Sequence, residues 1–321
     1  MRGRRNDVRQ LVAFRREDGT EFLRAGVEGF CEPPVVATGR LFCPGARLYA
    51  FDLSNGRPLW SIASADRLDM VQGTADAVRV YAGASEYGRT AEAFAADAAT
   101  GRVVWRRSFT GDGWTGANIN SLTLSPEGDL LVALVAKFGA NGAGGEAATV
   151  VAVDPATGQE RWRYQDGGAG RFGGIGGLTI WEDLVLYNDT YGFAATAFSR
   201  TTRAVVWRAP WTPTYAGTIR PPLVADGVAY FADGFGTTFA VDARTGVQRW
   251  RTNRPGNARS LEVCGPVVLM NNGPVEVLDR ATGRPRGRLL ADDDTAGQTA
   301  VADGVVYVSA KSGVYAFDCT S

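Results

Sequence analysis

The sequence predicts an all-β protein, a β-propeller built from four-stranded antiparallel blades. One phrase recurs along the chain, a second hairpin pattern precedes most copies of it, and no apolar period of a helix competes with them. Units of about 40 residues with four strands are typical of propeller blades. A single blade cannot bury both of its faces, so such units pack against one another.

The recurring phrase consists of alternating apolar residues, an Asp, a turn that ends in Thr-Gly, and a strand that ends in Trp. Its clearest copies span 48–60, 93–105, 150–162 and 238–250, and weaker ones span 196–207 and 275–287. Degenerate copies lie at 11–24 and 314–321. Alternation predicts strands, the Asp carboxylate can accept backbone N–H groups in the turn, and glycine tolerates positive φ there. Each phrase is therefore predicted to be a β-hairpin.

A second predicted hairpin comes before the phrase and completes a four-stranded unit. It is clearest at 33–43, 221–234 and 299–310, with variants at 122–135 and 178–189. We therefore expect a single domain over residues 1–321. It would hold six complete blades at about 33–290 and partial blades at about 11–25 and 299–319.

The expected strand count matches neither seven nor eight blades, because it exceeds seven blades by one strand and falls short of eight by three. We favour the eight-bladed family with an incomplete ring, and keep seven-bladed closure as the alternative. Met1 falls where a loop inside a blade is expected. We therefore also expect that the chain begins inside a blade of a longer protein.

Tryptophan closes the last strand of five units. These residues are Trp60, Trp105, Trp162, Trp207 and Trp250. Five equivalent positions around a ring cannot all face one ligand, so we expect the rings to fill the contacts between neighbouring blades.

The phrase A-x-D-x-x-T-G-x-x-x-W, best seen in VVAVDPATGQERW (150–162) and TFAVDARTGVQRW (238–250), resembles the tryptophan-docking repeat of the quinoprotein (PQQ-type) propellers. That family includes PQQ-dependent alcohol dehydrogenases, which use two adjacent cysteines and a Ca²⁺ ion. The four cysteines of this chain stand at 31, 43, 264 and 319, so none are adjacent. The resemblance is therefore to the non-enzymatic branch, with its BamB-like scaffolds and sensor domains. It implies an extracytoplasmic location, although no signal peptide is visible.

Composition narrows the function classes. Lys plus Arg is 34 and Asp plus Glu is 34, which removes the simplest case for nucleic acid or an anionic membrane surface as partner. The chain has no His, no paired-cysteine metal motif and no apolar stretch long enough for a membrane span. Together with the resemblance to the non-enzymatic branch, these observations lead us to expect a monomeric, non-catalytic binding or scaffold protein without metal or PQQ. The alternative is a PQQ-dependent oxidoreductase or another enzyme acting at the channel mouth.

The segments that lead from one unit to the next should emerge on one face, around the mouth of the channel. Arg220 and Arg259 hold the same repeat position in consecutive units, which favours an anion-attracting spot. The candidate ligand-binding residues are Arg220, Arg259, Asn120, Tyr215, Trp114, Arg171 and Glu32. They predict a protein partner or a small anionic ligand; the alternative is that they meet only solvent and loop backbone.

The cysteines carry one further expectation. Cys31 and Cys43 flank the hairpin at 33–43, so they could form a disulfide in an oxidising compartment, or remain two buried thiols. Cys264 is expected in the core, and Cys319 as a free thiol near the end of the chain.

Overall fold

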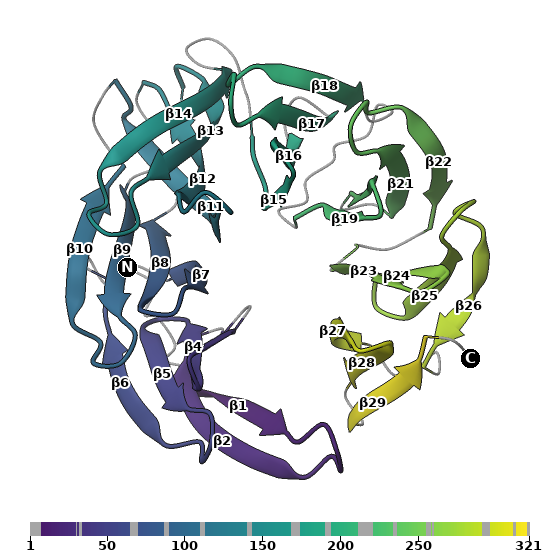
Figure 1. Ribbon diagram of the computed structural model, residues 1–321, viewed down its shortest axis with the longest axis horizontal. Helices are drawn as coiled ribbons and strands as arrows, with labels where there is room; N and C mark the ends of the chain where they lie inside the picture. Colours follow the sequence, from purple (N-terminus) through teal and green to yellow (C-terminus); the bar gives the residue numbers. More distant parts are fainter. Residues whose placement is uncertain are drawn as a thin grey trace. The chain divides into compact units, whose positions relative to one another are not determined.

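The computed structural model describes residues 8–29, 31, 34–64, 70–86, 90–109, 113–139, 143–167, 174–189, 194–210, 221–233, 236–254, 258, 260–290, 296–310 and 313–319. The chain divides into two compact units, Met1–Gly173 and Gly174–Ser321, and each is described by itself. Every sheet in the described residues is antiparallel and joins strands that follow one another in the chain (Figure 1).

The first unit contains one two-stranded and three four-stranded sheets. The two-stranded sheet is β1 (Val8–Phe14) and β2 (Glu21–Glu28). The next is β3 (Val35–Ala37), β4 (Arg40–Pro44), β5 (Leu48–Asp52) and β6 (Pro58–Ile62). It is followed by β7 (Met70–Ala75), β8 (Arg79–Glu86), β9 (Thr90–Asp97) and β10 (Val103–Ser108). The last is β11 (Gly116–Leu124), β12 (Leu130–Lys137), β13 (Glu146–Val153) and β14 (Glu160–Gly167).

The second unit contains three four-stranded sheets and one three-stranded sheet. The first is β15 (Leu178–Trp181), β16 (Leu184–Asp189), β17 (Ala194–Ser199) and β18 (Val205–Pro210). The second is β19 (Leu223–Ala225), β20 (Val228–Ala232), β21 (Thr237–Asp242) and β22 (Gln248–Asn253). The third is β23 (Ser260–Cys264), β24 (Val267–Asn271), β25 (Val275–Asp279) and β26 (Pro285–Leu289). The three-stranded sheet is β27 (Ala296–Ala302), β28 (Val305–Ala310) and β29 (Gly313–Asp318).

The predicted all-β class and four-stranded antiparallel blades are confirmed. The described residues hold 29 strands, one more than seven blades of four strands need and three fewer than eight blades need. The eight-bladed assignment is therefore not supported, and the seven-bladed alternative fits.

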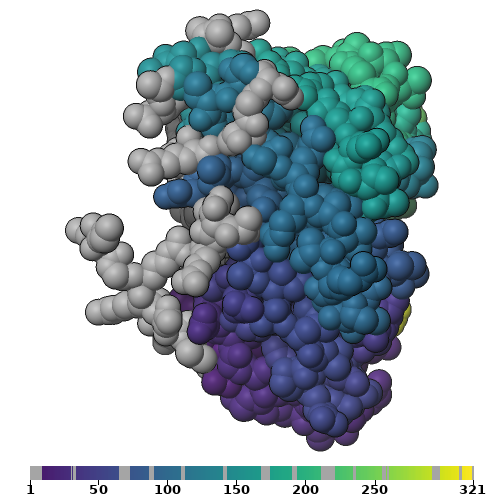
Figure 2. Space-filling view, turned by 90° about the vertical axis from the view of Figure 1, so that its left-hand side faces the viewer, coloured from purple at the N-terminus to yellow at the C-terminus, as the bar shows by residue number. Residues whose placement is uncertain are grey.

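The core of each unit lies in seams, the apolar layers between consecutive sheets. In the first unit the sheets follow one another in chain order, from purple through blue to teal in Figure 2. One apolar cluster fills each seam there, centred on Leu23 and Phe51, on Phe42 and Phe94, and on Tyr81 and Ile119. The second unit repeats this arrangement, with clusters around Phe231, Tyr230 and Leu269. Burial of both faces against neighbours is what the repeat requires of its strands.

The Asp of each phrase organises the turn between the third and fourth strands. Asp97 Oδ1 accepts hydrogen bonds from the backbone N–H of Ala99 and Thr100 and from the Thr100 hydroxyl. The N–H of Gly101, at a φ of 73°, donates to the Asp97 carbonyl. The same carboxylate contacts recur at Asp242 and Asp279, which explains why the phrase keeps Asp and Thr-Gly together.

Three tryptophans cross seams in one common way. Each ring packs on the turn glycine of the next sheet, and each Nε1 donates to the carbonyl three residues before that glycine. The bonds are Trp105 to Pro155 (2.9 Å), Trp207 to Ala243 (3.0 Å) and Trp250 to Arg280 (2.9 Å). A Cβ atom on Gly246 would lie only 2.6 Å from Trp207 Cδ2, so the turn needs glycine for space as well as for its φ of 72°.

Trp60 and Trp162 depart from this pattern. Trp60 packs on Gly101, but its Nε1 has no hydrogen-bond partner among the described residues. Trp162 is half-buried and donates to Asp129 Oδ2 of its own sheet, at 3.0 Å. Within the second unit, the turn of the copy at 196–207 has Arg203, with a φ of 61°, where the other turns have glycine.

All four cysteines are paired. Cys31 and Cys43 form a disulfide with a Cα–Cα distance of 5.1 Å, which ties the segment between β2 and β3 to β4. Cys264 forms a second disulfide with Cys319, at a Cα–Cα distance of 5.3 Å. The expectation of a free thiol at Cys319 is therefore wrong. Cys264 and Cys319 belong to different sheets, so the hairpin reasoning that suggested the first pair could not find the second.

Candidate functional site

Most of the residues predicted at the channel mouth lie outside the described residues. These are Arg220, Arg259, Tyr215, Arg171 and Glu32. Their proposed grouping therefore remains a prediction, and only Trp114 and Asn120 can be placed.

Trp114 is a core residue. It is 8% exposed and belongs to the apolar cluster that also contains Ile119 and Leu134. The Arg163 guanidinium lies over its ring, 4.9 Å from the centroid. Most of the indole is therefore already covered, which leaves little of it to form a wall for a ligand.

Asn120 stands at a β-bulge. In the pairing of β11 with β12, Ile119 opposes Leu134 and Ser121 opposes Ala133, so Asn120 is the extra residue. The first strands β7 and β27 are irregular at corresponding places, between Met70 and Gln72 and between Ala296 and Thr299. A bulge redirects a side chain and bends its strand. Asn120 is half-buried, and the bulge removes it from the regular alternation of β11.

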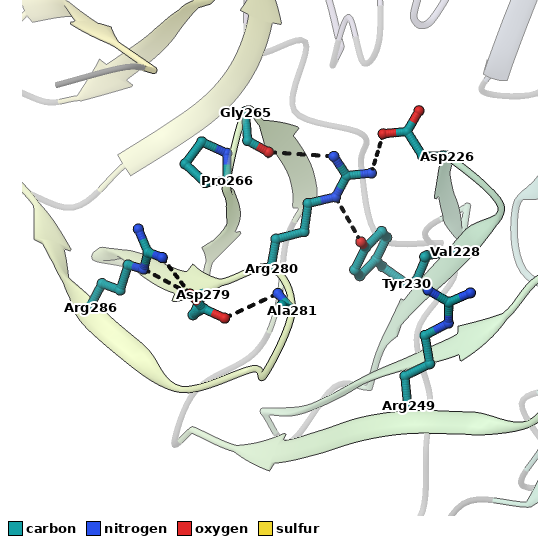
Figure 3. Close-up of a pocket in the computed structure, with 10 residues that line it drawn as sticks. All are labelled: Asp226, Val228, Tyr230, Arg249, Gly265, Pro266, Asp279, Arg280, Ala281 and Arg286. Atoms are coloured by element: carbon teal, nitrogen blue, oxygen red, sulfur yellow. Dashed lines mark hydrogen bonds and ion pairs between the residues drawn. The ribbon is translucent and has the colours of Figure 1, made fainter.

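The second unit has an open groove of about 440 Å³ between the β19–β22 sheet and the β23–β26 sheet (Figure 3). It lies at the turns between first and second strands and between third and fourth strands. Its polar lining consists of Asp226, Tyr230, Arg249, Asp279, Arg280 and Arg286.

Arg280 ties the two sheets together at this groove. Its Nε donates to the Tyr230 hydroxyl at 3.0 Å, and its second terminal nitrogen donates to Asp226 Oδ2 at 2.7 Å. The first terminal nitrogen donates to the Gly265 carbonyl at 3.4 Å. Figure 3 shows the guanidinium reaching between the two sheets toward these three partners. These contacts give Arg280 a structural role, because they link the β23–β26 sheet to the β19–β22 sheet.

The other two arginines of the groove neutralise turn carboxylates. Arg249 donates to Asp242 Oδ2 at 3.0 Å, and Arg286 donates to Asp279 Oδ2. Arg161 and Asp154 form the same pair in the first unit. In each case the Arg stands seven residues after the Asp, so the spacing of these pairs is visible in the sequence.

Each guanidinium of the groove therefore has a carboxylate partner among the described residues. The described residues do not gather three or more Cys, Asp or Glu side chains in a group that could hold a metal ion. Within the part of the chain that is described, no helix has the length and hydrophobicity needed to cross a membrane.

The Asp279 turn predicts a loss of stability in acid. Hydrogen bonds from the Thr282 hydroxyl and from Arg286 lower the pKa of Asp279 to about 2, against 3.8 for an ordinary Asp. Because the pKa is lower in the folded state, the ionised Asp279 carboxylate stabilises the fold above pH 3.8. This stabilisation is lost as pH falls through about 2. We expect Asp279→Asn to reduce the fall in thermal midpoint between pH 4 and pH 2. A fall as steep as that of the wild type would contradict this role.

Comparison with known protein families identifies the chain. The family model described as outer membrane protein assembly factor BamB matches residues 4–142 and 146–321. The chain belongs to this family of PQQ-type propeller repeats. The match confirms the resemblance drawn from the phrase at 150–162 and 238–250. A search of curated protein sequences finds no match.

Solved structures show the same fold at low sequence identity. BamB from Moraxella catarrhalis is 15% identical with a TM-score of 0.70, over 93% of this chain and 88% of that one. The computationally designed Ika8 protein is 15% identical with a TM-score of 0.72, over 96% and 90%. A europium-containing methanol dehydrogenase is 14% identical with a TM-score of 0.75, over 93% and 78%. These similarities include an assembly factor, a designed protein and an enzyme, so they support the fold alone.

Proposed function

We propose that this chain is a non-catalytic binding propeller that holds a protein partner as a scaffold. The observation that carries the proposal is the family match over nearly the whole chain, because that family is described as an assembly factor for outer membrane proteins.

The competing class is a quinone-dependent oxidoreductase, as the fold of the methanol dehydrogenase suggests. The resemblance to PQQ-dependent alcohol dehydrogenases implies two adjacent cysteines over the quinone. In this chain Cys31 pairs with Cys43 and Cys264 with Cys319, so no such pair exists. Both disulfides also favour an oxidising compartment, which supports an extracytoplasmic location.

We place partner recognition on the face that carries the segments between consecutive blades. Arg220 and Arg259 would form an anion-attracting spot on this face. Two guanidiniums at the same repeat position of consecutive blades favour a carboxylate between them, which a partner or a small ligand would supply. The edges of the blades are the second surface open to a partner.

A thermal-shift titration tests this placement. We expect sulfate or a small carboxylate to raise the thermal midpoint of the wild type by about 2 °C, through binding to the folded state. The gain should vanish in Arg220→Ala/Arg259→Ala and persist in Arg57→Ala/Arg102→Ala, a matched pair of exposed turn arginines. An equal rise of the thermal midpoint in all three proteins would contradict an anion site at Arg220 and Arg259.

The same proteins separate the scaffold from the enzyme. Incubation with PQQ and Ca²⁺ should give no dye-linked oxidation of alcohols, because the adjacent cysteines are missing. Turnover that depends on PQQ would overturn the non-catalytic assignment, whatever the result with anions.

A further inference from the structure

The carboxylate of Glu262, on β23, lies in the seam between the β23–β26 sheet and the β27–β29 sheet. Ser260 and Cys264, two residues before and after it on β23, both reach the second of these sheets. Ser260 Oγ lies 2.6 Å from Thr299 Oγ1, and Cys264 is bonded to Cys319. The pairing of β23 with β24 is regular, so side chains alternate and Glu262 points to the same side as Ser260 and Cys264.

The repeat does not put an ionisable residue at this position elsewhere. The corresponding residues of the other six first strands are Val35, Thr74, Thr123, Thr179, Leu223 and Ala300. Leu223, one sheet earlier, packs into the seam with Val268 and Leu278. Glu262 therefore replaces a residue type that suits a seam with one that does not.

Glu262 is half-buried, and apart from the hydrogen-bonded Ser260 and Thr299 hydroxyls its neighbours in the seam are apolar. Leu269, directly opposite on β24, is 2% exposed, and Val301 of β27 packs into the same cluster. The strands with the main contacts to β23 are β19, β20, β24 and β27. Their one titratable or charged residue is Tyr230, which faces the opposite seam and accepts a hydrogen bond from Arg280. Cys264 on β23 itself is held in a disulfide and does not titrate. No described residue of these strands therefore compensates a negative charge on Glu262.

Burial without a counter-charge disfavours the ionised form and raises the pKa of Glu262 to about 7, against 4.5 for an ordinary Glu. A raised folded-state pKa means that the closed seam has its full stability below pH 4.5. That stability is lost as pH rises through about 7, because the opened seam lets the carboxylate reach water.

We propose that Glu262 makes this seam respond to pH. The seam closes while the Glu262 carboxyl is uncharged; when the carboxyl ionises, water enters the seam and the β27–β29 sheet becomes less tightly packed. The Cys264–Cys319 disulfide keeps the loosened sheet attached at one end of the seam. The opening is therefore local and reversible, and it acts on the sheet that has three strands where the other sheets of the second unit have four.

Hydrogen exchange measured by mass spectrometry at pH 5.5 and pH 8.0 tests the proposal, after correction for intrinsic exchange rates. In the wild type, peptides from 296–310 should lose protection by about tenfold or more at the higher pH, while peptides from 223–232 should not. Glu262→Gln, which keeps the shape and removes the titration, should show no such loss. Glu262→Leu, which restores the residue found at position 223, should stay protected at both pH values.

Glu127→Gln is the matched control, because Glu127 is an exposed carboxylate of the first unit. It should keep the pH response of the wild type. A loss of protection in Glu262→Gln equal to that of the wild type would overturn the proposal, and so would a wild type whose 296–310 peptides are equally protected at both pH values.

Discussion

Replacing Trp207 by alanine should lower the free energy of unfolding by about 3–5 kcal/mol, the usual cost of emptying a buried tryptophan site. The Trp207 ring is 7% exposed, packs edge to face on Phe231 and covers Gly246. Its Nε1 donates to the Ala243 carbonyl across the seam. In the variant this buried carbonyl would lose its hydrogen bond from the indole. Urea denaturation would measure the loss as a lower midpoint with an unchanged slope.

Trp162→Ala is the control that separates a seam residue from a tryptophan of the same phrase. Trp162 is half-buried and bonds Asp129 in its own sheet, and Asp129 would keep its ion pair with Arg161. We therefore expect Trp162→Ala to cost less than half of what Trp207→Ala costs. Equal costs would show that both rings are docked alike.

A double-mutant cycle tests the contact directly. Gly246→Ala should be destabilising in the wild type, because the new Cβ would meet the Trp207 ring and the turn has a positive φ. In the Trp207→Ala background the ring is gone and only the backbone strain remains, so the same change should cost less. Additive costs would mean that the ring and the glycine do not interact.

These contacts explain how much of the fold could be predicted from the sequence. Strands, turns and blades follow from alternation and from the Asp and Thr-Gly of the phrase, which act through contacts a few residues apart. The contact between indole and turn glycine also had a signal, since both residues recur in the clear copies of the phrase. Recognising it required knowing that the indole packs on the following turn rather than on its own.

The candidate site was less predictable, because its residues meet across sheets. The position of Arg280 one residue after the turn Asp does not reveal that its guanidinium reaches Tyr230 and Asp226 of the preceding sheet. Trp114 looked like a loop aromatic but is buried beneath Arg163. Glu262 follows an ordinary strand pattern, and only the seam around it makes the carboxylate unusual.

Removing the Cys264–Cys319 disulfide should produce the second large effect. A bridge stabilises mainly by restricting the unfolded chain, and the restriction grows with the number of residues it encloses. The two cysteines are 55 residues apart, against 12 for Cys31 and Cys43. We expect Cys264→Ala/Cys319→Ala to lower the free energy of unfolding by about 4 kcal/mol, and Cys31→Ala/Cys43→Ala by about 3 kcal/mol.

Reduction of the wild type with dithiothreitol gives an independent measurement of the same bridges. In Cys264→Ala/Cys319→Ala the reductant should cause only the smaller loss that belongs to Cys31–Cys43, because the larger one has already been removed. Alanine suits the site, since Cys264 is 1% exposed and both sulfurs lie in the apolar cluster with Leu269 and Val308. If reduction leaves the urea midpoint of the wild type unchanged, the bridges do not restrain the unfolded chain, and β27–β29 must be held by the seam alone.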